Sequence, residues 1–345
     1  MTLPEILQRI SDSGSITVNL LLTRKCQYQC GHCMFSSSPT MPGDQMRWDD
    51  LNAIKSFIDQ INEKADEYDT DLHWSINLVG GEPTLDKDHF ARTIDQVSRW
   101  GHQVEMTTNG WWLEDPQNIV KFSRAVWAHL DSEMLIRISN SEYHLPWRSP
   151  ELQQFFEPLV GRKPSYSARP VNPLVGLLED KIDQMWSEAE DKEYCVKTES
   201  DTYYIDVLKV NAENDLIYID NQRMGTRNVS PVGRAKKNQF GDQDGLCHST
   251  DDVKFTFMPT KEGARPGRLY DPCCNGGKVP LGFADEGLRL LIKRYLYMEA
   301  LHSTFPGKDL HGARCWACPS FGAKWMKQLD EKEIENIIND EKEFA

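Results

Sequence analysis

The stretch SITVNLLLT at residues 15–23 is the first of four short β-rich runs in the amino-terminal part of the chain. Each of the first three runs is followed by a longer stretch in which apolar residues recur at helical spacing. The other three runs are LHWSINLVG (72–80), HQVEMTT (102–108) and MLIRIS (134–139), and the helical stretches cover 48–67, 87–100 and 116–127. This alternation predicts repeated β-α units around a parallel sheet, either a barrel or a doubly wound sheet.

Further along the chain the pattern becomes less regular. The runs TYYIDVLKV (202–210) and DLIYID (215–220) predict two more strands. The segment 146–173 contains six prolines, so it cannot be one continuous helix or central strand, and we expect an insertion over about 146–200. Periodicity ends near Gly233, which predicts a first domain over 1–233.

Residues 234–328 are rich in Gly, Pro and Cys, which predicts a small α+β domain in which metal ligation substitutes for a large apolar core. The tail, residues 329–345, has one apolar stripe in a charged sequence and predicts a surface helix. The stripe is formed by Leu329, Ile334, Ile337 and Ile338.

Composition limits the possible partners. The chain has 345 residues, enough for one large domain or two smaller ones, and a net charge of −14. This charge disfavours nucleic acid and anionic membrane surfaces as partners. No apolar run approaches the ~20 residues that span a bilayer, and the start predicts an amphipathic helix and not a signal peptide. We therefore expect a soluble, cytoplasmic protein.

The nine cysteines fall into groups. An odd number of cysteines without an export signal disfavours a disulfide framework. Three lie within eight residues, five more lie between 247 and 318, and Cys195 stands alone between the groups. The grouping predicts two metal sites.

The first group has the spacing Cys-x3-Cys-x2-Cys, in TRKCQYQCGHCMF at residues 23–35. A loop after a strand can wrap three such thiolates around one 4Fe-4S cluster, and the fourth iron is then open to an external ligand. S-adenosylmethionine (SAM) can chelate that iron through its amino and carboxylate groups. The alternatives are a zinc site with His32 as fourth ligand, or simply buried thiols.

The spacing of Cys26, Cys30 and Cys33 after the first strand resembles the radical SAM superfamily over about residues 15–235. The resemblance implies a 4Fe-4S cluster on these three cysteines, SAM as cofactor, and a partial (β/α)6 TIM-like barrel. It also implies that the residue before the third cysteine, His32, packs near the adenine.

The second strand ends in Gly80, Gly81, Glu82 and Pro83, where the glycine pair lets backbone approach a ligand closely. This end is similar to the family's GGEP motif, which implies that it holds the SAM amino group. The third strand ends in TTNG, where Asn109 is a candidate SAM or substrate contact. Trp111 and Trp112, which follow directly, could wall the cavity.

The fourth strand ends in RISNSEYH (137–144), which resembles the family segment in which a Ser and an acidic residue precede a Tyr or His. Ser139 is therefore a candidate for the SAM carboxylate or ribose, whereas Asn140 replaces the acidic residue. A local turn bond to the backbone is the alternative for both Asn109 and Asn140. All these groups follow strand ends, where (β/α) barrels have their active sites.

The second cysteine group ends in Cys-x2-Cys and can supply four thiolates to a closed site, either structural zinc or a second 4Fe-4S cluster. The set is Cys247, Cys273 or Cys274, Cys315 and Cys318. Together with SPVGRA (230–235) and DPCCNGG (271–277), it resembles the Twitch or SPASM extensions of radical SAM proteins, which implies an auxiliary iron-sulfur cluster. Neighbouring side chains diverge, and we favour Cys274 over Cys273.

These features predict an oxidoreductase that cleaves SAM to a 5'-deoxyadenosyl radical and abstracts hydrogen from a substrate, with a flavodoxin- or ferredoxin-type reductant. The predicted substrate is a ribosomally made peptide or protein. The alternative is a dehydrogenase or epimerase of a sugar or aminocyclitol. A non-enzymatic alternative is an iron-sulfur electron carrier or a zinc-stabilised binding module. No catalytic side chain is assigned.

Overall fold

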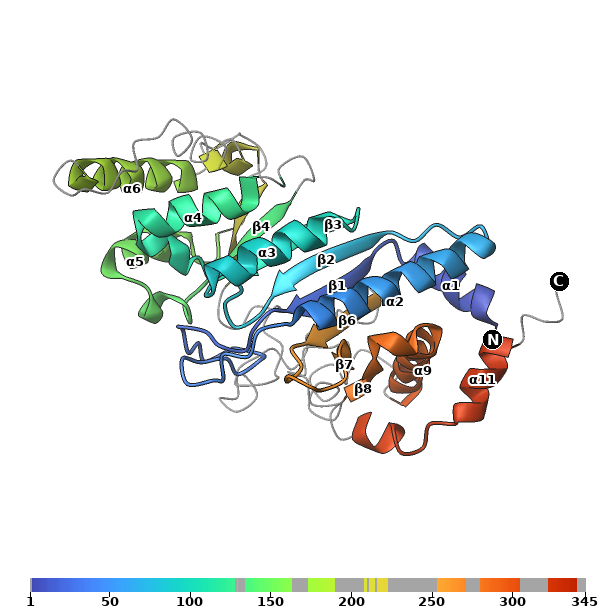
Figure 1. Cartoon of the computed structure of the whole chain (residues 1–345). Helices are drawn as coiled ribbons and strands as arrows, with labels where there is room; N and C mark the ends of the chain where they lie inside the picture. Colours follow the sequence, from blue (N-terminus) through green and yellow to red (C-terminus); the bar gives the residue numbers. More distant parts are fainter. Residues whose placement is uncertain are drawn as a thin grey trace. The chain divides into compact units, whose positions relative to one another are not determined.

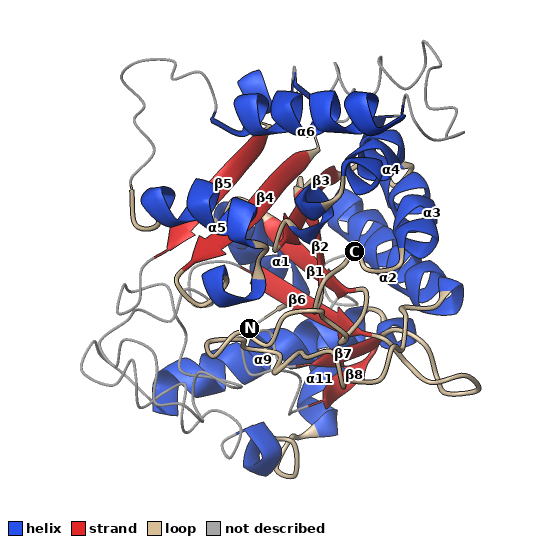
Figure 2. Cartoon of the chain, turned by 90° about the vertical axis from the view of Figure 1, so that its left-hand side faces the viewer, coloured by secondary structure: helices blue, strands red, loops and turns tan. Residues whose placement is uncertain are grey.

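The computed structural model describes residues 2–127, 129, 134–162, 173–189, 208–209, 211–214, 216–222, 253–270, 280–304 and 322–339. Within them the fold is α/β, with helices and mostly parallel strands (Figure 2). The chain divides into two compact units, Met1–Gly81 together with Gly225–Ala345, and Glu82–Met224. Among the described helices, none has the length and apolar character needed to cross a membrane.

The first unit is built around β1, which pairs in parallel with β2 on one side and with β6 on the other. Two antiparallel strands, β7 and β8, continue the sheet beyond β6. The elements are α1 (Leu3–Asp12), β1 (Ile16–Leu21), α2 (Trp48–Glu67), β2 (Trp74–Val79), β6 (Val253–Met258), β7 (Arg268–Tyr270), β8 (Pro280–Phe283), the 3-10 turn η5 (Ala284–Glu286), α9 (Leu288–Thr304) and α11 (Glu331–Asn339).

Helix α2 covers the apolar face of these strands (Figure 1). Its fully buried Phe57 meets the rings of Trp74, Phe255 and Phe257 in edge-to-face contacts with centroid separations of 5.3 to 6.5 Å. Aromatic pairs of this geometry contribute about 0.5–1.5 kcal/mol each beyond their buried area. Because Trp74 lies on β2 and the two phenylalanines on β6, one helical residue holds two strands in place.

The second unit has β4 at its centre, parallel to β3 on one side and to β5 on the other. Helices α3 and α4 lie side by side (Figure 1) and join through stacked aromatic rings. The elements are α3 (Lys87–Ser98), β3 (Gln103–Thr108), the 3-10 helix η1 (Trp111–Glu114), α4 (Pro116–Trp127), β4 (Leu135–Ser141), η3 (Leu145–Trp147), α5 (Pro150–Phe156), η4 (Glu157–Leu159), α6 (Pro173–Ala189) and β5 (Ile217–Gln222).

The predicted α/β class is confirmed, and the four strands and three helices of the first 140 residues lie where their periodicity places them. The predicted strand over 202–210 is wrong at Leu208 and Lys209, which are helical, as are 211–213. The physical reason is burial: Leu208 and Ala212, four residues apart, are both buried, a spacing that fits a helix face. Tertiary packing therefore overrides the β propensity of this run.

Two helices in the described part of the proline-rich segment begin with a proline. Pro150 opens α5 after Ser149, whose hydroxyl accepts from the backbone N–H of Leu152, and Pro173 opens α6. Proline suits the first helical turn because the N–H that it lacks has no partner there. The predicted domain boundary at Gly233 lies outside the described residues, and β6, on the far side of it, pairs with β1.

Candidate functional site

The predicted cysteine loop leaves the carboxyl end of β1 in the first unit. Two backbone bridges hold it, between Thr23 and Gln45 and between Lys25 and Ser38. Cys26 and Cys30 are buried and Cys33 is half-buried, and all three are free thiols. The three predicted ligands therefore lie on one loop that is held by two backbone bridges.

Backbone amides of the loop donate to two of the sulfur atoms. The N–H of Tyr28 lies 3.3 Å from Sγ of Cys26, and the N–H of Ser37 lies 3.3 Å from Sγ of Cys33. Two of the three sulfur atoms therefore accept hydrogen bonds from the backbone of their own loop. Ser36, between them, has a left-handed backbone with φ of 54°, uncommon for a residue with a side chain.

The loop does not hold its sulfur atoms at one common point. Within the described ranges, no three His, Cys, Asp or Glu side chains are arranged as ligands of a metal ion. His32 is half-buried beside the cysteines. The structure thus brings the predicted ligands into one loop without converging them.

Gly81 packs directly against the cysteine loop. A Cβ at this position would lie 2.2 Å from the carbonyl oxygen of Lys25 and 2.9 Å from that of Arg24. The N–H of Gly81 donates to the carbonyl of Thr23 at 2.7 Å. We expected the glycine pair of the GGEP motif to make room for a ligand, and at Gly81 the group that approaches is the loop itself. Gly80 precedes it, half-buried, directly after β2.

Glu82 opens the second unit and is completely buried. Its Oε1 accepts from the hydroxyl of Thr84 at 2.6 Å and from that of Thr108 at 2.7 Å, and its Oε2 accepts from the N–H of Asn109 at 2.8 Å. Burial raises the pKa of Glu82, and these hydrogen bonds oppose the shift. The carboxylate therefore ties the GGEP motif to the end of β3. Pro83, next to it, is buried as well.

Asn109 makes the local bond that was the alternative to a ligand contact. Its Oδ1 accepts from the backbone N–H of Trp111 at 2.9 Å, and the residue is buried. Gly110 follows with φ of 77°, and a Cβ there would lie 2.9 Å from the side chain of Ile138 on β4. A glycine is required at this turn because the conformation is left-handed and the neighbouring strand is close.

Arg148 is a buried residue of this unit that the sequence reasoning missed. Its guanidinium donates to Oδ1 of Asn140 at 2.7 Å, to the carbonyl of Ser139 at 2.8 Å and to the carbonyl of Asn109 at 3.2 Å. It also lies over the ring of Phe156, 3.7 Å from its centroid. One side chain thus fixes the carboxyl ends of β3 and β4, and no local sequence signal distinguishes it from a solvated arginine.

Polar side chains at the end of β4 form hydrogen bonds with other groups of the protein. Nδ2 of Asn140 donates to the carbonyl of Phe156 at 3.0 Å and to Oδ1 of Asn221 on β5 at 2.8 Å. Ser141 and His144, both buried, share a hydrogen bond of 2.8 Å. Ser139 is half-buried. Asn140 therefore acts as a cross-strand tie between β4 and β5.

The second cysteine group lies outside the described residues. This applies to Cys247, Cys273, Cys274, Cys315 and Cys318, and also to Cys195. The prediction of an auxiliary site therefore stays a prediction.

Comparison with known proteins gives three findings. Residues 20–131 match the model of the radical SAM superfamily. The "Putative peptide biosynthesis protein YydG" of Bacillus subtilis (strain 168) is 24% identical over 132 residues, 38% of this chain and 37% of that protein. The match therefore spans little more than a third of the relative's length. The crystal structure of BtrN in complex with AdoMet and 2-DOIA aligns with a TM-score of 0.43 at 12% identity, covering 86% of this chain and 92% of that one.

Proposed function

We propose that this chain is a radical SAM enzyme that cleaves SAM reductively to a 5'-deoxyadenosyl radical and abstracts a hydrogen atom from a ribosomally made peptide or protein. One observation carries the proposal. The segment that matches the superfamily, residues 20–131, contains a stapled loop with three free thiols at the carboxyl end of β1. The carboxyl ends of strands are where (β/α) folds have their active sites.

Cys26, Cys30 and Cys33 would hold a 4Fe-4S cluster. The donor set fits, because three thiols can ligate three irons of the cluster and leave the fourth open to SAM, and backbone N–H groups donate to Sγ of Cys26 and Cys33. Binding requires the three side chains to turn toward a common point. When bound, the cluster supplies the electron that breaks the sulfonium bond of SAM.

The chain's own residues would bind and orient SAM in two ways. His32 and Ser139 are half-buried and are our candidates for direct contact, with the backbone at Gly80 and Gly81. Glu82 acts indirectly, because its four hydrogen bonds to Thr84, Thr108 and Asn109 are all within the protein. Pro83 and Asn109 complete the proposed set. The carboxylate of Glu82 would thus orient the backbone that adjoins the cofactor.

A peptide substrate is supported by the partial relative, which is named as a peptide biosynthesis protein. The auxiliary 4Fe-4S cluster on Cys247, Cys274, Cys315 and Cys318 remains part of the proposal, with zinc as the other occupant. A second cluster can accept one electron from a substrate radical, so that abstraction ends in oxidation or in a new bond. A flavodoxin- or ferredoxin-type protein would supply electrons.

The test of the chemistry is anaerobic reconstitution with iron and sulfide, followed by iron counting and an assay for 5'-deoxyadenosine after addition of SAM and dithionite. We expect about eight irons per chain if both clusters form and about four if zinc occupies the second site. Cys30→Ala should abolish cleavage of SAM. Cys195→Ala, which removes a thiol outside both groups, should retain it. Absence of 5'-deoxyadenosine from the reconstituted wild type would refute the assignment.

The substrate class can be tested by hydrogen transfer. Host cells are grown in D2O, and their peptide fraction and their sugar and cyclitol fraction are offered separately to the reconstituted enzyme. Abstraction moves deuterium from the substrate to the 5' carbon of 5'-deoxyadenosine, which mass spectrometry detects. Deuterium transfer from the peptide fraction alone is the expected result, and transfer from the sugar fraction alone would establish the alternative substrate class.

A further inference from the structure

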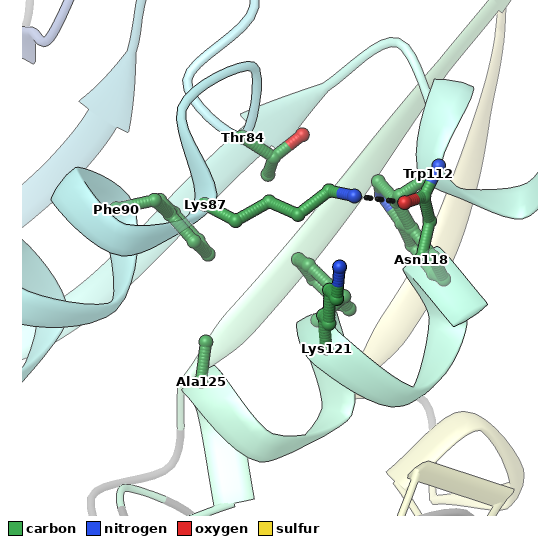
Figure 3. Close-up of a pocket in the computed structure, with 8 residues that line it drawn as sticks. Thr84, Lys87, Phe90, Trp112, Asn118, Lys121 and Ala125 are labelled. Carbon is green, nitrogen blue, oxygen red and sulfur yellow. Dashed lines mark hydrogen bonds between the residues drawn. The ribbon is translucent and has the colours of Figure 1, made fainter. Parts of the chain in front are cut away.

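A small pocket lies between α3 and α4 in the second unit. One of its lining residues, Thr84, donates to Glu82, and the other lining residues have no part in the proposed cofactor site. Figure 3 shows the side chain of Lys87, from α3, reaching toward Asn118 on α4. The residues that line the pocket are Thr84, Lys87, Phe90, Trp112, Asn118, Lys121, Phe122 and Ala125.

Three stacked aromatic rings form the apolar part of this pocket. The ring of Trp112 lies 4.1 Å from that of Phe122, and Phe90 stacks on Phe122 at 5.9 Å, in each case with planes 10° apart. All three side chains are buried. An apolar wall lowers the local dielectric, so that charges and hydrogen bonds beside it interact more strongly than in water.

Two lysines supply positive charge beside this wall. Lys87 is half-buried and donates to Oδ1 of Asn118, and its ammonium lies 5.4 Å from the ring of Trp111. Lys121 is exposed at the rim. Burial lowers the pKa of Lys87 and the charge of Lys121 lowers it further, whereas the charges of Asp115 and Asp88 act in the opposite direction. An anion bound between the two ammonium groups would offset the repulsion between their positive charges.

The pocket also contains a buried donor that lacks an acceptor. In the part of the chain that the structure describes, Nε1 of Trp112 has no hydrogen-bond partner, although the residue is only 1% exposed. None of the described residues that line the pocket is acidic. A buried N–H without a partner is uncommon, because it gives up its hydrogen bond to water and gains none in return.

We propose that this pocket binds a single carboxylate group. A carboxylate accepts several hydrogen bonds and can satisfy both ammonium groups and Nε1 of Trp112 at once. The free space at the deepest point suits about one water-sized group, so only the head of the ligand enters. The carboxylate belongs either to an acidic side chain of a peptide or to a small organic acid.

The test measures protection of lysines against an amine-labelling reagent, followed by mass spectrometry of the full-length chain. The probes are formate and a glutamate-containing tripeptide with blocked ends, each compared with chloride at the same ionic strength. Formate should reduce labelling of Lys87 and Lys121 several-fold and leave Lys55 and Lys332 unchanged. Protection at lower concentration by the tripeptide would identify a peptide side chain as the source, and the reverse order a small acid.

Trp112→Phe supplies the matched variant, because it keeps the stacked ring and removes only the N–H. It should raise the formate concentration needed for half protection about tenfold or more, since a hydrogen bond to a charged group is worth about 1.5–3 kcal/mol. A urea unfolding curve confirms that the variant is folded. Unchanged labelling of Lys87, equal protection by chloride, or equal protection of Lys55 would each overturn the proposal. The test uses neither SAM nor iron, so its outcome is independent of the proposed function.

Discussion

At the scale of single residues, Gly81 has the most restricted position in the described chain. A methyl group at this site would overlap the backbone of Lys25 and Arg24, and backbone cannot move aside as the end of a flexible side chain can. The glycine therefore has a structural reason independent of any ligand: the cysteine loop and the end of β2 must touch.

Gly81→Ala should consequently lower the free energy of unfolding by about 1–3 kcal/mol, the usual cost of overpacking a tightly packed site. It should also reduce the iron bound by the cysteine loop, because the overlap displaces Lys25, which adjoins Cys26. Urea unfolding and iron counting measure the two effects. Gly176→Ala in α6 is the control, since a Cβ there has nothing within 4 Å and alanine favours a helix interior. If wild type and Gly81→Ala had the same free energy of unfolding, the cysteine loop would move aside for the methyl group, and the proposed restriction at Gly81 would be wrong.

Arg148 is a second residue whose side chain contacts several segments of the chain. Arg148→Met removes the donors to Asn140, Ser139 and Asn109 and leaves buried acceptors unpaired. Removing one partner of a buried polar network costs about 3 kcal/mol, and we expect a loss of unfolding free energy of that size.

Arg148→Lys should recover only part of this loss, because an ammonium is a point donor and cannot serve three acceptors arranged around a fork. Arg162→Met, at an exposed position of the same unit, should change the unfolding free energy by no more than about 0.5 kcal/mol. If Arg148→Met were as stable as Arg162→Met in urea, the guanidinium would have no role in holding the strand ends.

At the scale of elements, α2 holds the first unit together through Phe57. This ring is fully buried and contacts one residue of β2 and two of β6. Phe57→Ala should lower the unfolding free energy by about 3–5 kcal/mol, because it combines lost burial with a cavity. Glu63→Ala, on the exposed face of the same helix, should be nearly neutral. A loss below about 1 kcal/mol for Phe57→Ala would mean that the surrounding strands close the cavity.

In the second unit, the elements are joined by polar contacts in addition to apolar packing. Thr84 donates its hydroxyl proton to Glu82 and accepts from Nε1 of Trp111, while Glu82 accepts from the end of β3. The pocket between α3 and α4 includes Thr84 and is thus one hydrogen bond from Glu82. An occupant of the pocket would adjoin the network that orients Asn109.

At the scale of the whole molecule, the proposed cofactor residues are divided between the two units. The cysteine loop, Gly80 and Gly81 belong to the first, and Glu82, Asn109 and Ser139 to the second. The GGEP motif itself contains the division, between its second and third residues. The chain has a net charge of −14, so the lysine pair of the α3–α4 pocket differs in sign from the chain as a whole.

The positions of most strands and helices in the first 141 residues followed from the order of the residues alone. Periodicity placed β1 to β4 and α2 to α4, because alternate burial in a strand and 3.6-residue burial in a helix leave a direct trace in residue order. The cysteine spacing likewise predicted one loop with three ligands. The periodicity of strands and helices and the spacing of the cysteines depend on residues that are close together in the sequence. These features can therefore be predicted without knowledge of the tertiary structure.

The sequence does not indicate which polar side chains are hydrogen-bonded to other groups of the protein, and the tertiary structure does. Glu82 and Asn140 are buried and hydrogen-bond to other segments of the protein, while Arg148 gave no local signal and joins two strand ends. The helix at Leu208 depends in the same way on a partner surface far away in sequence. Burial and hydrogen-bond partners arise from contacts between distant segments, and residue order along one segment does not contain them.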